Sequence, residues 1–136
     1  MRLLIILTAL AAPISASTII SDSTLPPAPD ILMGDSFVCT DAMTLLRTKE
    51  AALAGYMQAN KSVDVISEQL RTSKCVVTED DADVIIKRLA IGRIVGIQKD
   101  TVSELIVQVE LDGKAMWTES VNLLNADFHE LRISEK

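Results

Sequence analysis

The chain has few of the residues, and none of the motifs, that commonly carry catalysis or hold a cofactor. Its 136 residues include one histidine, His129, and two cysteines, Cys39 and Cys75. No glycine-rich phosphate loop, GxSxG, HExxH or CxxC motif is present. The three residues do not make the four-ligand set of a structural zinc site without carboxylates. We therefore expect a protein that is not an enzyme and uses no cofactor or metal ion.

Basic runs are absent too, and aromatic residues are scarce. The chain has 13 Lys and Arg against 19 Asp and Glu, with no cluster of Lys or Arg. Such a chain is unsuited to nucleic acid and to anionic membrane surfaces. Proteins that bind sugars or single strands usually present several aromatic platforms. The sequence has only four aromatic residues: Phe37, Tyr56, Trp117 and Phe128.

An apolar run of about ten residues, Leu3–Ala12, lies near the N-terminus between Met1–Arg2 and Pro13–Ala16. It is too short to span a membrane, which takes about 20 apolar residues. We predict a signal peptide over 1–16, a periplasmic or secreted protein, and no stable membrane insertion after cleavage. Because Arg2 is the only charged residue removed, cleavage changes the formal net charge from −6 to −7.

The next residues, 17–36, are predicted to be a flexible linker. Leu25–Pro29 contains three prolines, each of which fixes its backbone angle and lacks an N–H donor. Such segments favour extended conformations. We expect a single domain to follow over 37–125, with a C-terminal tail over 126–136.

Two helices are predicted over residues 37–75. Asp41 is a favourable N-cap for a first helix, in which apolar residues recur at steps of three and four. Gly55 either ends this helix early or lies inside it, where it permits close packing. Residues 60–62 predict a turn into a second helix, whose apolar residues share one face: Val63, Ile66 and Leu70.

The two cysteines flank this helical hairpin. Cys39 precedes the first helix and Cys75 follows the second, and an antiparallel pair brings these outer ends together. A redox pair usually has CxxC spacing, so in an exported protein we expect a structural disulfide. Closing this loop would stabilise the fold by roughly 3.5–4 kcal/mol in the chain-entropy model.

After the second cysteine the pattern changes from helix to strand. Val84–Ile97 is rich in β-branched residues, and Leu105–Leu111 alternates apolar and polar residues, which indicates a strand with one buried face. Asp112–Gly113 is a typical two-residue hairpin turn, and Lys114–Thr118 would be the returning strand. We predict an antiparallel β unit over 76–125.

The densest charge cluster is Glu79–Asp83. A calcium loop requires alternating ligands and then a glycine, as in D-x-D-x-D-G, and this run lacks that pattern. Blocks of like charge usually form solvated surface. We expect an exposed turn between strands here rather than an ion site.

The one tryptophan, Trp117, is the candidate partner-binding residue, and the hairpin register decides its surroundings. A two-residue turn pairs Trp117 with Gln108, on the face opposite the apolar row of the preceding strand. A three-residue loop would pair it with Val107 in the core, because one residue of slip exchanges the faces. An exposed tryptophan is a typical interface anchor, whereas a buried one fills a core. The sequence leaves both open.

The order of these features resembles a group of small exported bacterial proteins of unassigned function. The resemblance covers about residues 37–125, and its second half is similar to bacterial SH3-type units. It implies an α+β domain: a two-helix hairpin held by a disulfide, then a small antiparallel sheet or SH3-like barrel. The chain lacks the L-N-V-R-x-G-P opening of cell-wall-targeting SH3 units, so peptidoglycan binding is not implied. The matching features are Cys39, Cys75, Asp112–Gly113, Trp117 and Leu123–Leu124.

The function expected from these observations is a non-catalytic protein-binding module of the bacterial envelope or periplasm. Its partner would be another envelope or secreted protein, bound through Trp117. The alternative is an inhibitor or immunity protein against a basic secreted hydrolase such as a lysozyme, because an acidic surface steers a basic target. A small hydrolase that uses His129 is the least favoured reading, since no catalytic motif accompanies it.

Overall fold

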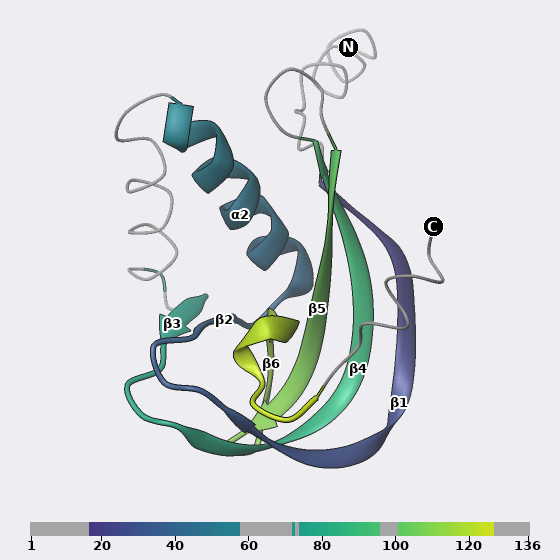
Figure 1. Ribbon diagram of the computed structural model, residues 1–136, viewed down its shortest axis with the longest axis vertical. Coiled ribbons are helices and arrows are strands. Elements are labelled where there is room, and N and C mark those ends of the chain that lie inside the picture. Colours follow the sequence, from purple (N-terminus) through teal and green to yellow (C-terminus); the bar gives the residue numbers. More distant parts are fainter. Residues whose placement is uncertain (1–16, 58–71, 73, 96–100, 127–136) are drawn as a thin grey trace, which may run out of the picture.

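The computed structural model describes residues 17–57, 72, 74–95 and 101–126. In this part of the chain six strands form one antiparallel sheet, and one α-helix, α2, packs on a face of it (Figure 1). The strand order is β1-β4-β5-β6-β2-β3. The elements are β1 (Thr18–Leu32), β2 (Phe37–Cys39), α2 (Ala42–Met57), β3 (Cys75–Val77), β4 (Ala82–Val95), β5 (Thr101–Leu111), β6 (Lys114–Glu119) and the 3₁₀ helix η2 (Ser120–Asn122).

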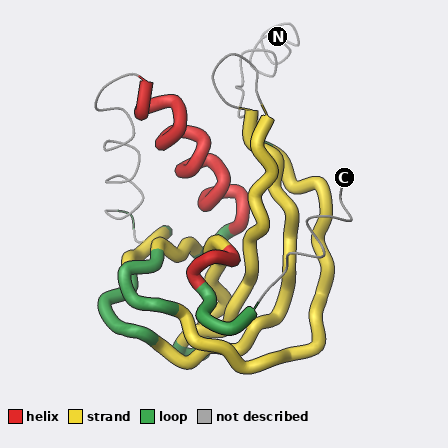
Figure 2. The backbone as a smooth tube through the Cα atoms, viewed as in Figure 1, coloured by secondary structure: helices red, strands yellow, loops and turns green. Residues whose placement is uncertain are grey.

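The predicted α+β fold with a two-helix hairpin is wrong. The described residues are mostly strand, and the one α-helix among them, α2, packs against the sheet (Figure 2). The helix predicted after residues 60–62 lies outside the described residues. Gly55 lies inside α2, which continues to Met57. A long sheet replaces the small one because residues 17–36, assigned to a linker, belong largely to it.

These residues form β1, an edge strand paired with β4 along its length. An edge strand needs hydrogen bonds on one side only, so it tolerates prolines that a central strand excludes. The register shifts between Thr24 and Ala28, so that Leu25–Pro27 lie opposite Lys87 alone. This bulge takes up two of the three prolines without breaking the ladder on either side.

The predicted hairpin between β5 and β6 is confirmed, and of the two registers that the sequence left open it has the one of a two-residue turn. Leu111 pairs with Lys114, and Gln108 pairs with Trp117, as a two-residue turn requires. Asp112 has φ 51° and Gly113 has φ 80°, the left-handed conformation that this turn needs at both central residues. The local sequence therefore sets which side chains of β6 face each side of the sheet.

One face of the sheet forms a first hydrophobic core, which the sheet encloses by curving (Figure 1). The end of β1 meets the residues after β6: Met33 N donates to Asn122 O at 2.9 Å, and Leu124 N donates to Ile31 O at 2.9 Å. These backbone hydrogen bonds close the core at this end of the sheet. The core consists of Leu32, Val38, Val84, Ile86, Leu89, Leu105, Val107, Val109, Met116 and Leu123.

The opposite face forms a second core under α2. The helix begins at an N-cap, as predicted, because Asp41 Oδ2 accepts a hydrogen bond from Thr44 N at 3.0 Å. It approaches β4 closely at Gly92, where an added Cβ would lie 2.6 Å from both methyl carbons of Leu46. The second core consists of Cys39, Leu45, Leu46, Cys75, Ala90, Ile94, Ile106 and Trp117.

Several predictions concern residues outside the described ranges. They are the signal peptide at 1–16 and His129 with most of the tail over 126–136. In the part of the chain that the structure describes, no helix is long and apolar enough to cross a membrane.

Candidate functional site

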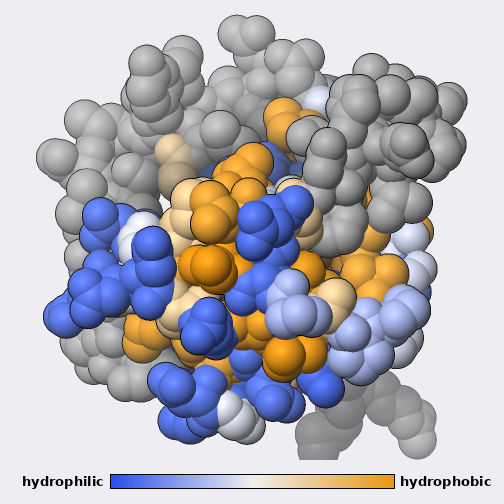
Figure 3. Space-filling view, turned by 60° about the horizontal axis from the view of Figure 1, so that its bottom comes forward, coloured by the Kyte–Doolittle hydropathy of each residue, from blue (hydrophilic) through white to orange (hydrophobic). Residues whose placement is uncertain are grey.

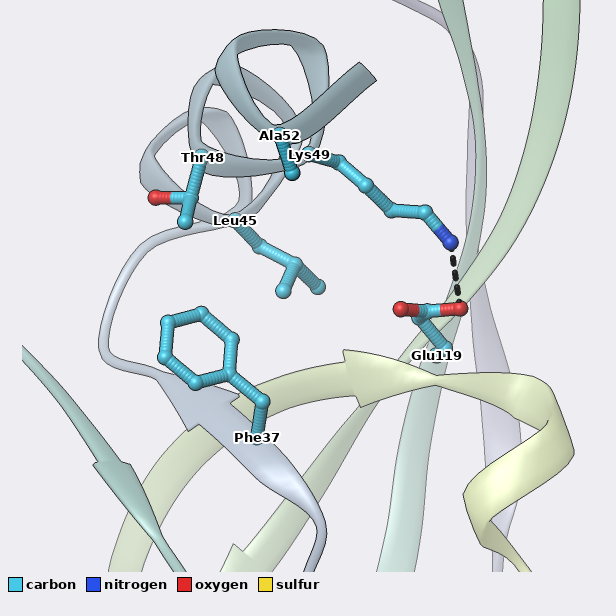
Figure 4. Close-up of a pocket in the computed structure, with 6 residues that line it drawn as sticks. All are labelled: Phe37, Leu45, Thr48, Lys49, Ala52 and Glu119. Atoms are coloured by element: carbon cyan, nitrogen blue, oxygen red, sulfur yellow. Dashed lines mark hydrogen bonds and ion pairs between the residues drawn. The ribbon is translucent and has the colours of Figure 1, made fainter. Parts of the chain in front are cut away.

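A cavity of about 220 Å³ lies between α2 and the strands β2 and β6 (Figure 4). Its walls are mainly apolar, and its one polar side carries an ion pair. Side chains from three elements that are distant in sequence line it: Phe37, Leu45, Thr48, Lys49, Ala52 and Glu119. The cavity therefore exists only because the helix and the two strands meet here.

Helical spacing places four of the lining residues on one face of α2. Leu45, Thr48, Lys49 and Ala52 follow one another at steps of three, one and three residues, which repeat on the same side of a helix. Thr48 Oγ1 donates to the backbone carbonyl of Thr44 at 2.8 Å, so its hydroxyl is satisfied within the helix. The helix thus presents an apolar wall with one charge at its edge.

The strands supply the opposite wall. Phe37 of β2 projects its ring toward Leu45, and Glu119 at the end of β6 stands at the other side (Figure 4). Phe37 pairs with Val77 of the edge strand β3, and directly opposed residues project from the same face. Val77 is exposed, so an apolar surface continues from the cavity wall to the edge of the sheet.

Lys49 is held between two carboxylates at the polar side of the cavity. Its Nζ lies 2.6 Å from Glu119 Oε2 and 3.3 Å from Glu104 Oε1, and all three side chains are half-buried. Burial lowers the pKa of Lys49, but its hydrogen bond and charge interaction with Glu119 and the charge of Glu104 outweigh this, so the pKa is raised above its ordinary value. The lysine is therefore charged at neutral pH, and the cluster of one cation and two anions has a net charge of −1.

The predicted disulfide between Cys39 and Cys75 is confirmed, with both residues fully buried. Its setting differs from the prediction, since it joins paired residues of β2 and β3 instead of the ends of two helices. The bond attaches β3 to the strand that bears Phe37. It therefore supports the strand side of the cavity wall.

Trp117 is not at the surface. It pairs with Gln108, the first of the two alternatives that the sequence left open, and lies on the face opposite Val107 and Val109. That face was expected to be the outer one, but α2 covers it, and Trp117 is 7% exposed. A side chain so enclosed offers little area to a partner, so we do not retain Trp117 as a partner-binding residue.

A second surface lies where the end of β1 meets η2. Val121 and Leu124 are 66% and 55% exposed, which is unusual for large apolar side chains in one short segment. The turn after β1 also contacts the acidic cluster Glu79–Asp83, because Gly34 N donates a hydrogen bond to Asp81 Oδ1 at 2.8 Å. The face seen in Figure 3 carries hydrophobic residues between hydrophilic ones. The acidic residues Glu79–Asp81 are exposed, as the sequence predicts.

Sequence reasoning missed the residues that make the cavity. Lys49 lies between apolar residues of the helix, and nothing in the sequence pattern connects it with Glu104 or Glu119. A lone lysine in an apolar stripe is a usable signal, since such a residue must reach solvent or a partner charge. Which carboxylate it meets depends on the docking of α2 on the sheet. Among the described residues, no group of His, Cys, Asp and Glu could hold a metal ion.

The chain matches no protein-family model, no curated protein and no solved structure. The resemblance to small exported proteins with an SH3-like unit therefore stays a prediction.

Proposed function

We propose that this chain is a non-catalytic exported module of the bacterial envelope or periplasm, or a secreted one, that binds another protein. The buried disulfide supports export, because such bonds form and persist mainly in oxidising compartments. The N-terminal pattern of a basic start and a short apolar run supports it as well.

The observation that carries the binding function is the cavity beside α2. At about 220 Å³ it is smaller than the pockets that hold drug-sized ligands, which measure roughly 300–1,000 Å³. It has room for one large side chain. Binding energy at protein interfaces is concentrated in a few anchor side chains that enter such pockets. The exposed Val77 beside Phe37 extends the apolar contact area beyond the cavity.

Filling the cavity tests this function. Ala52 lines it and is half-buried, so Ala52→Leu adds three carbon atoms to the space without removing any contact. We expect the variant to unfold at the same temperature as the wild type or slightly above it, because the added methyl groups occupy empty space. The variant should nevertheless lose the partner that the wild type captures from envelope extract, as identified by crosslinking and mass spectrometry.

Arg47→Ala is the matched control. Arg47 lies on the same helix, is exposed and does not line the cavity. It should leave both stability and capture unchanged, within about 0.5 kcal/mol for the free energy of unfolding. If Ala52→Leu folds normally and still captures the same protein, the cavity is not the binding site and the proposal fails.

An inhibitor or immunity protein against a basic secreted hydrolase is the second candidate. The exposed Val121 and Leu124, together with the exposed carboxylates of Glu79–Asp81 that the turn after β1 contacts, favour it, because acidic and apolar surface complements a basic protein. Capture that weakens steeply between 50 and 500 mM salt would support this candidate, since screening acts on exposed charges. Capture that tolerates salt supports an apolar anchor in the cavity.

A further inference from the structure

The carboxylate of Glu119 gives the cavity a chemical preference. Its Oε2 accepts the hydrogen bond from Lys49 Nζ at 2.6 Å. Its other oxygen, Oε1, lies on the side of the cavity (Figure 4). Within the described ranges no residue donates a hydrogen bond to Oε1. An acceptor oxygen therefore faces an otherwise apolar space.

The charges at this side exclude an anion, and the apolar walls favour a neutral donor over a second cation. Two carboxylates share one ammonium, so a further hydrogen-bond donor is favourable and an anion is repelled. A second cation would also have to lose its water against the apolar walls, which is costly for a charged group. A neutral N–H or O–H group satisfies Oε1 at a lower desolvation cost.

The apolar walls define the rest of the group. Phe37 offers an aromatic ring, and Leu45 and Ala52 offer aliphatic surface, in a volume of about 220 Å³. Aromatic rings pack favourably against one another edge to face or offset. Tryptophan and tyrosine combine an aromatic body with a donor at its edge, and both are common interface anchors.

We propose that the cavity receives an aromatic side chain with a hydrogen-bond donor, a tryptophan or tyrosine of the partner, and that Glu119 Oε1 accepts its hydrogen bond. This inference rests on the proposed function and specifies the partner group that the cavity selects. Glu119 thus decides between aromatic groups with a donor and those without one.

Two small probes of nearly equal shape test it. N-acetyl-tryptophanamide carries the indole N–H, and its 1-methylindole analogue replaces that hydrogen with a methyl group. Titrations of the disulfide-bonded protein, followed by amide chemical shifts of Phe37, Thr48 and Glu119, give both affinities. We expect the donor probe to bind about three- to tenfold tighter, as one hydrogen bond predicts. Equal affinities, or no binding of either probe at these residues, would overturn the inference.

Two matched variants assign the preference to the correct carboxylate. Both Glu104 and Glu119 contact Lys49, but only Glu119 lines the cavity. Glu119→Leu should abolish the difference between the two probes, while Glu104→Leu should keep it. If the difference persists in Glu119→Leu, or disappears in both variants, Glu119 is not the acceptor and the inference is wrong.

The two proposals fail in different ways. If the two probes bind the cavity equally or not at all, while Ala52→Leu still prevents partner capture, the proposed function holds. Only the inference that the cavity prefers an aromatic group with a hydrogen-bond donor is then wrong. If Ala52→Leu captures the partner normally, the proposed function fails whatever the probes do.

Discussion

Replacing Trp117 by alanine measures how much the second core contributes to stability. Trp117 is 7% exposed and packs under α2 with Leu46 and Ile106. Truncating a buried tryptophan removes its apolar contacts and leaves a cavity, which costs about 3–5 kcal/mol. For a domain of this size that loss lowers the midpoint of thermal unfolding by roughly 10–20 °C.

Urea unfolding followed by far-UV circular dichroism is the suitable assay, because the variant has lost the fluorescent group. Gln108→Ala is the control. Gln108 is the cross-strand neighbour of Trp117 and is only half-buried, so its replacement should lower the free energy of unfolding by less than about 1 kcal/mol. The emission of the wild type, which comes from Trp117 alone, should be blue-shifted and resist iodide. A change below about 1 kcal/mol for Trp117→Ala, together with quenchable emission, would show that α2 does not cover this face.

Two further predictions concern the turn and the disulfide. Gly113→Val should destabilise the protein by about 1 kcal/mol or more, because Gly113 has φ 80° and a branched residue resists that angle. Nothing lies within 4 Å of an added Cβ there, so Gly113→Asn should unfold at nearly the wild-type temperature. If both variants lose the same stability, the backbone angle is not the cause. Thiol counting on the denatured, unreduced protein should find no free thiol, and the double change of Cys39 and Cys75 to serine should cost roughly 3.5–4 kcal/mol in urea unfolding. Two titratable thiols in protein isolated without reductant would contradict the bond.

Interactions between neighbouring residues were enough to predict the β5–β6 hairpin turn and the start of α2. Asp112–Gly113 restricts the backbone to one tight turn, and this turn fixes the pairing of Trp117 with Gln108. The cap by Asp41 likewise involves only neighbouring residues. Such features are readable from sequence because the interacting groups are close together along the chain.

The role of residues 18–32 was not readable in this way. The prolines of Leu25–Pro29 indicate an extended segment equally well whether it is a free linker or an edge strand. Whether this segment is a linker or a strand depends on β4, which offers β1 backbone groups to hydrogen-bond and apolar side chains to pack against. The paired residues of β4 lie 50 to 75 positions further along the chain, and no local pattern specifies the pairing.

The sequence by itself determined the tight turn of the β5–β6 hairpin, that the two cysteines pair, and where the exposed acidic turn lies. Only the tertiary structure decided whether each face is buried. Alternation tells a strand's two faces apart, but burial depends on what covers them, and here α2 covers the face that bears Trp117. The same docking brings Lys49 to Glu104 and Glu119 and leaves the cavity beside Phe37. The candidate site is therefore a product of packing between distant segments, which a sequence motif does not encode.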